Sequence, residues 1–209
     1  MIAERDVRAA LATVRDPELD EPVTDLGFVA GLRIDGDRIE VDLRLPTFFC
    51  APNFAWIMVA DAERALSELP GVTAARVTLG DHFASDELRT TSTFQDAFGA
   101  EAGGELDDLR RLFARKAFLA RQHAVVEALG RVPATIAEVP AGDPYLERRA
   151  ELGLDMRPQA PFLVTAAGAP VADPERHLRL GRSIRVSIEG NAGLCRGLLA
   201  TRYGEEVAA

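Results

Sequence analysis

The spacing of apolar residues over the first eighty positions predicts five elements in the order helix, strand, strand, helix, strand. Over residues 3–14, apolar side chains recur every three or four positions, which indicates a helix packed by one face. Apolar and polar residues then alternate over 29–34 and 39–45, on either side of Asp35-Gly36-Asp37. Because aspartate–glycine supplies the positive φ angles of a tight turn, these two strands are predicted to form an antiparallel hairpin.

A second helix is predicted over residues 52–69. Pro52 is tolerated in a first helical turn, and one apolar face continues from there to Leu69. Pro70-Gly71 ends this helix, and residues 72–79 have the composition of a third strand. The five elements together predict an α+β domain.

The second half of the chain is predicted to form a separate domain of mixed α/β character. Small residues and paired glycines at 100–104 indicate a linker with a boundary near residue 102, which gives domains of 1–99 and 105–209. A long helix is predicted over 106–129. The remaining predictions are helices at 144–152 and 174–180, short strands at 162–165 and 183–188, and either a last helix over 191–203 or a hairpin across 189–193.

Composition narrows the classes of protein that the chain can be. Its 209 residues are 47% apolar and 27% charged, which is enough to bury a core in one or two domains. A formal charge of −9, from 24 basic and 33 acidic side chains, disfavours nucleic acid as a partner. We also expect no membrane partner and a cytoplasmic location, because no apolar run approaches the roughly 20 residues that span a bilayer and the first residues do not resemble a secretion signal.

Cys50 carries the clearest chemical signal in the chain. It lies between a predicted strand and the helix that begins near Pro52. Free backbone N–H groups and the positive end of the helix dipole favour an anion at that point, so this cysteine is predicted to lose its proton readily and to attack or bind metal as a thiolate. A buried structural cysteine is the alternative interpretation.

Three separated signatures surround Cys50 in the first domain. Asp16-Pro17-Glu18-Leu19 follows the first helix, Asp25-Leu26-Gly27-Phe28-Val29 leads into the first strand, and a segment from Asp81 to Ser85 follows the third strand. With these signatures, residues 1–99 resemble the PaaD/SufT group of iron–sulfur and metal-centre assembly proteins. The resemblance implies a small α+β domain that helps to insert iron–sulfur clusters or iron into client enzymes. It also implies that the cysteine is the functional residue and that the protein is not itself an enzyme.

The loop before Cys50 departs from the pattern of this group. Its members commonly have a threonine four residues before the cysteine and a proline directly after it. This chain has Pro46 and Ala51 at those positions, with Thr47 and Pro52 each displaced by one residue. Thr47 is therefore the candidate for the role of that threonine.

The same loop is unusually apolar. Phe48 and Phe49 replace small residues, which suits the loop to docking a protein partner. As a single soft ligand, Cys50 cannot complete a tetrahedral metal site. A metal ion or cluster bound there is therefore expected to be transient and shared with another molecule.

Acidic residues of the signatures have structural explanations as well as chemical ones. Asp16 and Glu18 could accept a cationic ligand, but a local turn bond for Asp16 and a solvated Glu18 are the simpler interpretation. Asp25 lies just ahead of Gly27 and is expected to fix the loop backbone, so that it shapes the pocket around Cys50.

Asp81 and His82 are the second candidates for metal ligands after Cys50. They directly follow a predicted strand, where functional loops gather, and carboxylate and imidazole are ordinary iron ligands. A surface histidine is the alternative for His82. Cys195 is expected to pack as a small apolar residue in the second domain, although its sulfur could meet that of Cys50 at one metal ion if that domain folds back over the first.

These interpretations combine into an accessory protein for metalloenzyme maturation. Cys50 would hold iron or an iron–sulfur cluster transiently, and a client that offers more ligands would take it. The second domain would bind the client, whose leading candidate is a di-iron or iron–sulfur oxygenase because relatives with long extensions resemble accessory factors of such enzymes. A homodimer is compatible with this interpretation.

Two other functions remain open from the sequence. The first is a metal-independent folding adaptor that grips an apo-oxygenase through the second domain. The second is a thiol enzyme that uses Cys50 as its nucleophile, for which no base is visible nearby in the sequence.

Overall fold

The structure is a computed structural model of the whole chain, and it describes every residue except 1, 91–93, 95, 97–105 and 205–209. The predicted linker at 100–104 and its boundary near residue 102 lie outside the described residues. Contacts divide the chain into two compact units, which are described separately below. Unit 1 comprises Met1–Leu106 and Asn191–Ala209, and unit 2 comprises Asp107–Gly190.

Unit 1 is built on a three-stranded sheet in the order β1-β2-β3. The strands are β1 (Val29–Asp35), β2 (Arg38–Leu43) and β3 (Ala74–Leu79). β1 and β2 are antiparallel around Gly36, whose φ of 62° fits the predicted aspartate–glycine turn. β2 and β3 are parallel, with Leu43 opposite Leu79. The predicted hairpin and the α+β class are confirmed.

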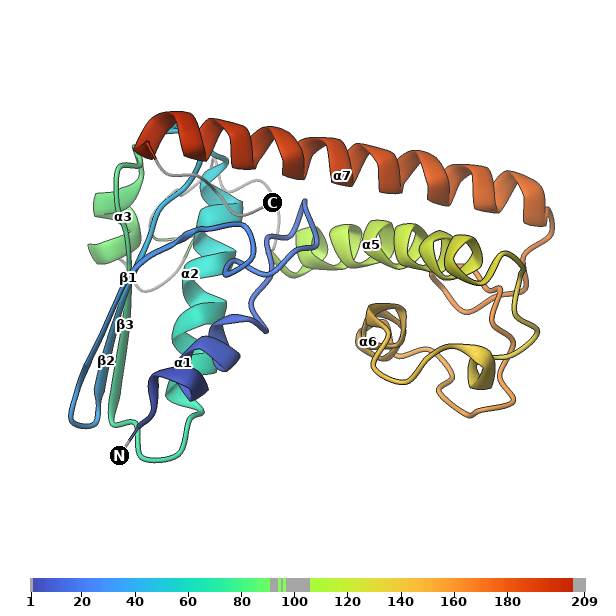
Figure 1. Cartoon of the computed structure of the whole chain (residues 1–209), viewed down its shortest axis with the longest axis horizontal. Coiled ribbons are helices and arrows are strands. Elements are labelled where there is room, and N and C mark those ends of the chain that lie inside the picture. The colour runs from blue at the N-terminus through green and yellow to red at the C-terminus, as the bar shows by residue number, and fades with distance from the viewer. Residues whose placement is uncertain (1, 91–93, 95, 97–105, 205–209) are drawn as a thin grey trace. The chain divides into compact units, whose positions relative to one another are not determined.

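Helices α1 (Glu4–Leu11) and α2 (Pro52–Ser67) cover one face of this sheet (Figure 1). The period-two pattern of β2 fits this arrangement, since its apolar residues Ile39, Val41 and Leu43 are buried and the residues between them are exposed. Each such buried side chain contributes roughly 1.5–3 kcal/mol of transfer free energy. The order helix, strand, strand, helix, strand is as predicted, with α3 (Ser85–Thr90) following β3.

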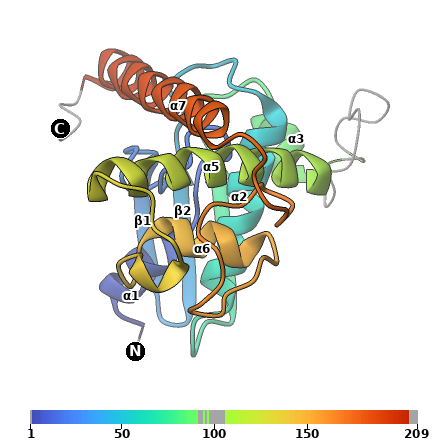
Figure 2. The same cartoon turned by 90° about the vertical axis from the view of Figure 1, so that its right-hand side faces the viewer.

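The regular elements described for unit 2 are helices, joined by turns and irregular segments. It contains α5 (Leu106–Leu129), a 3-10 turn at Ile136–Glu138, α6 (Pro144–Glu151) and the first part of α7 (Pro174–Tyr203). α5 and this part of α7 lie side by side (Figures 1 and 2). His177 of α7 bonds to Gln122 of α5 at 2.6 Å, and Arg185 pairs with Glu127 at 2.6 Å.

The strand predicted at 162–165 is wrong. This segment has bends and isolated bridges instead of a strand ladder, and buried side chains donate to its carbonyl groups. Gln122 donates to the carbonyls of Phe162 and Val164 at 3.0 and 3.3 Å, and the Tyr145 hydroxyl donates to Phe162 at 2.9 Å. Because these side chains supply the donors that a partner strand would supply, the segment keeps strand-like composition without a sheet.

The strand predicted at 183–188 and the hairpin across 189–193 are also wrong, because both segments are part of α7. The alternation of apolar residues there does not mark one face, since Val186 is 55% exposed whereas Ile184 and Ile188 are partly buried. Packing against α5 therefore overrides the local β propensity. The helix predicted over 191–203 exists as the end of α7, but the contacts place residues from Asn191 onward with unit 1 and not with the second domain.

Across the described residues, the helices are all too short or too polar to cross a membrane.

A glycine in α7 allows its close approach to α5. A Cβ atom at Gly181 would lie 2.7 Å from the Leu119 carbonyl oxygen, whereas one at Gly190 would meet nothing within 4 Å. Gly190→Ala is therefore expected to raise the free energy of unfolding by roughly 0.5–1 kcal/mol through helix propensity. Gly181→Ala gains the same helix propensity, but it is expected to lower the free energy of unfolding because the backbone of α5 at Leu119 would have to move away from the new Cβ atom. Thermal unfolding followed by circular dichroism measures both, and a Gly181→Ala variant as stable as Gly190→Ala would contradict this packing.

Candidate functional site

The site of unit 1 lies where the parallel strands β2 and β3 end. Because parallel strands present their carboxyl ends at the same edge of a sheet, the loops that follow them start side by side. The Gly80 N–H donates to the Leu43 carbonyl at 2.9 Å, and the Phe83 N–H donates to the Phe48 carbonyl at 3.2 Å. These bonds tie the loop that carries Cys50 to the loop that carries His82.

Cys50 is partly exposed and has a polar neighbour. The Thr47 hydroxyl oxygen lies 3.2 Å from the Cys50 sulfur, and either group can be the donor. Cys50 directly precedes Ala51, the N-cap of α2, which makes no side-chain capping bond, and the first turn of α2 contains no acidic residue. Asn53 Oδ1 accepts from the Phe54 N–H at 3.0 Å, but no carboxylate of this turn neutralises the positive end of the dipole beside this sulfur.

His82 holds the Cys50 loop in place. Its side chain is buried, with Nε2 2.7 Å from the Cys50 carbonyl oxygen and Nδ1 accepting from the Ala84 N–H at 3.2 Å. These two partners fix the neutral imidazole with its proton on Nε2. Burial also lowers the pKa of the ring, which favours the same neutral form. With both nitrogens engaged, His82 positions Cys50 and has no free lone pair to offer a metal ion.

Asp81, the other candidate ligand in this loop, interacts with Arg202. Its backbone has a φ of 49°, and its carbonyl accepts from Arg202 at 2.6 Å. Its exposed carboxylate lies 3.9 Å from the same guanidinium. Asp81 therefore links its loop to the end of α7, and no described contact joins its carboxylate to Cys50.

The candidates in the first two signatures lie in turns. Asp16 is buried, and its Oδ1 accepts from the N–H groups of Glu18 and Leu19 at 2.8 and 2.9 Å, which is the local turn bond considered from the sequence. Burial raises the pKa of Asp16 to about 6. Glu18 is exposed, and the exposed Asp25 accepts from the Thr24 hydroxyl at 2.9 Å.

An exposed aromatic cluster borders the Cys50 loop. It consists of Phe48, Phe49 and Phe83, which are 45%, 78% and 45% exposed. Their ring centroids lie 5.0 to 6.4 Å apart. Sequence reasoning identified Phe48 and Phe49 but missed Phe83. The strand–helix–strand order of β2, α2 and β3 implies parallel strands, and this signal could have placed Phe83 beside Phe48 and Phe49.

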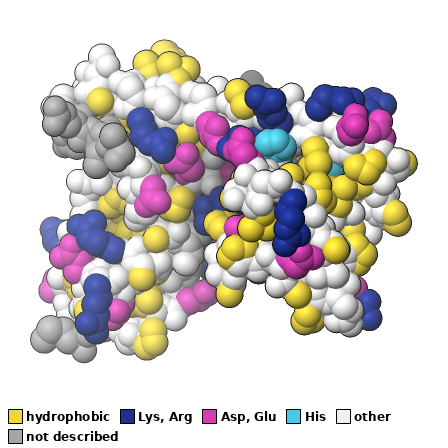
Figure 3. Space-filling view, turned by 45° about the vertical axis from the view of Figure 1, so that its right-hand side comes forward, with side chains coloured by type: hydrophobic (Ala, Val, Ile, Leu, Met, Phe, Trp, Pro, Cys, Tyr) yellow, Lys and Arg dark blue, Asp and Glu magenta, His cyan; other side chains and the backbone are white. Residues whose placement is uncertain are grey.

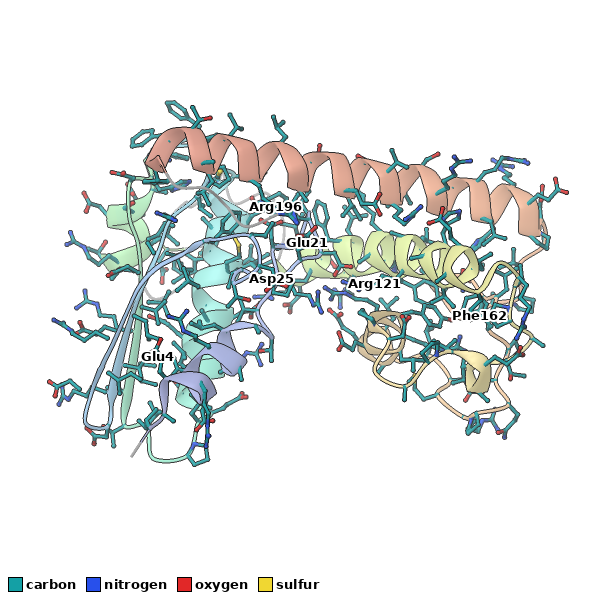
Figure 4. The ribbon with its side chains drawn as sticks, viewed as in Figure 1. Glu4, Glu21, Asp25, Arg121, Phe162 and Arg196 are labelled. Carbon is teal, nitrogen blue, oxygen red and sulfur yellow. The ribbon has the colours of Figure 1, made fainter. Side chains whose placement is uncertain are left out.

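The end of α7 also borders this site, which the sequence did not reveal. Arg196 pairs with Glu21 at 2.6 Å, and Figure 4 shows the two side chains next to each other. Arg202 donates to the Leu45 carbonyl at 3.1 Å. Cys195 packs against the core of unit 1, so its predicted place in the second domain is corrected. The partners in these two contacts are 175 and 157 positions apart in sequence, so the sequence gave no local signal of them.

Metal-ligating side chains are sparse in the described part of the chain. It contains no group of three or more His, Cys, Asp or Glu residues that could hold a metal ion. On the face in Figure 3, the described acidic and basic side chains are interspersed. Cys50 thus offers a sulfur ligand without a complete protein-derived coordination sphere.

Comparison with known proteins identifies the N-terminal segment. Residues 4–79 match the family described as iron-sulfur cluster assembly protein. The resemblance predicted for the first domain is confirmed over these residues. Proteins named iron-sulfur cluster carrier protein from Mycobacterium leprae and Mycobacterium tuberculosis are 38% and 35% identical to this chain over 85 residues. Each match covers 40% of this chain and 21% of the relative, so the chain spans about a fifth of the length of these relatives.

A solved structure is also similar to part of this chain. It is a domain of unknown function (DUF59) from Bacillus anthracis, which is 24% identical, with a TM-score of 0.35. The match covers 40% of this chain and 80% of that one. 

The buried Asp16 generates a prediction about pH. Because its pKa is about 6 in the native state and near 3.8 when unperturbed, the native state binds this proton more tightly than the unfolded chain does. The stability that Asp16 contributes is full below about pH 4 and falls by up to about 3 kcal/mol as the pH rises through 6. Asp16→Asn keeps the Oδ1 acceptor without the charge, so it is expected to be more stable than the wild type at pH 7 and equally stable near pH 4.

Urea unfolding from pH 4 to pH 7.5, followed by the fluorescence of the single tryptophan Trp56, measures this difference in unit 1. Asp25→Asn is the control, because it removes an exposed carboxylate of the same segment and should change stability by less than about 0.5 kcal/mol. A difference between Asp16→Asn and the wild type that does not vary with pH would contradict the assignment.

Proposed function

We propose that this protein takes up iron or an iron–sulfur cluster at Cys50 and passes it to a client metalloenzyme without catalytic turnover of its own. The match of residues 4–79 to iron-sulfur cluster assembly proteins and the names of the mycobacterial relatives support this role. The observation that carries the proposal is the placement of Cys50. Its sulfur is partly exposed beside a hydroxyl group, in a loop that buried His82 holds against the end of the sheet.

The scarcity of other ligands suits a carrier more than a permanent metal site. Iron and iron–sulfur clusters prefer several thiolate or imidazole ligands, and a site with fewer of them binds weakly. Remaining positions on the cargo would be filled by small thiols or by the client. A client with more ligands in a fixed geometry then binds the cargo more tightly, which makes transfer favourable.

The neighbours of Cys50 serve both uptake and release. When cargo leaves, the Thr47 hydroxyl can donate to the sulfur at 3.2 Å and stabilise the free thiolate. His82 fixes the backbone of the loop through the Cys50 carbonyl, and its Nδ1 is occupied by the Ala84 N–H. The imidazole therefore positions the sulfur without retaining the cargo.

The aromatic cluster of Phe48, Phe49 and Phe83 is the proposed docking surface for the client. Exposed aromatic side chains beside a functional loop are typical of protein interfaces, and they place the client next to the cargo. The leading client is a di-iron or iron–sulfur oxygenase. Unit 2 is proposed to provide a second contact with it.

Cluster uptake tests the role of Cys50. The whole protein is incubated anaerobically with iron(II), sulfide and a small thiol, and its visible absorption and its iron and sulfide content are measured. The wild type is expected to acquire a cluster, and Cys50→Ala to lose most of it while remaining folded, because Cys50 is only partly buried. Equal iron and sulfide content in the two proteins would overturn the proposal.

The same preparations test the docking surface by transfer to an apo-[2Fe–2S] ferredoxin as a probe acceptor. Phe49→Ala is expected to load normally but to transfer several-fold more slowly, because it removes the most exposed ring of the cluster. Leu112→Ala, which truncates an exposed side chain of α5, should leave both steps unchanged. Normal transfer by Phe49→Ala would argue against the aromatic cluster as the docking surface.

A further inference from the structure

The last three turns of α7 present one face to the core of unit 1. Ala192, Cys195, Leu199 and Tyr203 are spaced by three or four residues, so they share a side of the helix. All four pack in or against the core that also contacts Cys50. Ala192 and Leu199 are 0% and 1% exposed, which shows that this face of the helix is closely covered and that Cys195 lies between two buried residues.

Two arginines anchor this part of the helix to the site. Arg196, next to Cys195, pairs with Glu21 at the end of the turn that contains Asp16 and Glu18. One turn and a half later, Arg202 donates to the carbonyls of Leu45 and Asp81 at 3.1 and 2.6 Å. Leu45 precedes the Cys50 loop and Asp81 precedes His82. The helix end is therefore bonded to the turn that contains Asp16 and to both loops of the Cys50 site.

The electrostatic surroundings of Cys195 agree with this placement. Burial, and then the nearby charges of Asp16, Cys50 and Glu18, raise the pKa of the Cys195 thiol to about 11. Cys50 and Cys195 also pack against the same core of unit 1. Both side chains are partly exposed, so neither is sealed from an incoming ligand.

We propose that Cys195 supplies a second sulfur ligand beside Cys50, so that unit 1 binds its cargo, a thiophilic metal ion or an iron–sulfur cluster, through two thiolates. This inference rests on the proposed function and makes its ligand set specific. Cys195 lies outside residues 4–79, so the second ligand comes from the part of this chain that the family match does not cover.

A thiophilic cation bound between these sulfurs would replace both thiol protons and neutralise the two thiolates. On binding, the Cys195 proton leaves to solvent and the sulfur lone pair bonds to the metal. Two thiolates hold a cluster or a tetrahedral ion more firmly than one does, and they still leave positions for a client to occupy.

The first test is whether the two thiols are adjacent in the folded protein. Dibromobimane, a short reagent that fluoresces strongly only after both of its arms have alkylated thiols, is added to the whole protein. The wild type is expected to become fluorescent by intramolecular cross-linking, and Cys50→Ala and Cys195→Ala are expected to remain dark. Leu194→Ala is a matched control because it changes an exposed neighbour on the same helix. A dark wild type would overturn the proposal.

The second test counts the sulfur ligands with cobalt(II) as a probe for iron(II), because sulfur-to-cobalt charge-transfer absorption increases with each thiolate bound. Each single alanine variant is expected to lose about half of the wild-type intensity, and the double variant nearly all of it. Loss in Cys50→Ala with no change in Cys195→Ala would overturn the two-sulfur site but leave the proposed function standing. No change in either variant would overturn both.

Discussion

Parallel pairing of β2 with β3 is the constraint on which the Cys50 site depends. The strands are in register to their last residues, with Leu43 opposite Leu79, so the loops that follow them leave the same edge of the sheet. Residues more than thirty positions apart in sequence therefore meet there, and the bond from His82 to the Cys50 carbonyl is possible only in this arrangement. The crossover helix α2, which the parallel pairing requires, begins at Pro52, two residues after Cys50, so the positive end of its dipole lies near that residue.

Several features of the site lower the stability of the fold instead of raising it. Asp16 is buried with a raised pKa, which at neutral pH costs free energy that its two turn bonds only partly offset. Asp81 occupies the left-handed backbone region, and Phe49 is largely exposed. Features of this kind persist where function or the surrounding structure requires them. Phe49 in the Cys50 loop and Asp81 in the loop bonded to it agree with the view that this edge of the sheet, and not the sheet itself, is the functional part of unit 1.

Local chemistry in the sequence was sufficient to predict the sheet of unit 1, its helices α1 and α2, and helix α5 of unit 2. Aspartate–glycine specified the hairpin, Pro52 marked the start of α2, and the helical spacing after residue 105 marked α5. The errors arose where distant residues decide the structure. The carbonyls of residues 162 and 164 are satisfied by Gln122 and Tyr145, and β-branched residues of α7 are helical because that helix packs on α5. For the same reason, the sequence identified Cys50 and Thr47 but could not show that Phe83 and Arg202 border the same site.

X-ray absorption at the iron K-edge tests the central claim of this account most directly. The whole protein is loaded with iron(II) in the absence of sulfide, so that any sulfur bound to iron must come from the protein. The account predicts an iron–sulfur scattering path in the wild type that is clearly weakened in Cys50→Ala. Iron surrounded only by oxygen and nitrogen in the wild type, or the same sulfur scattering in both proteins, would contradict it.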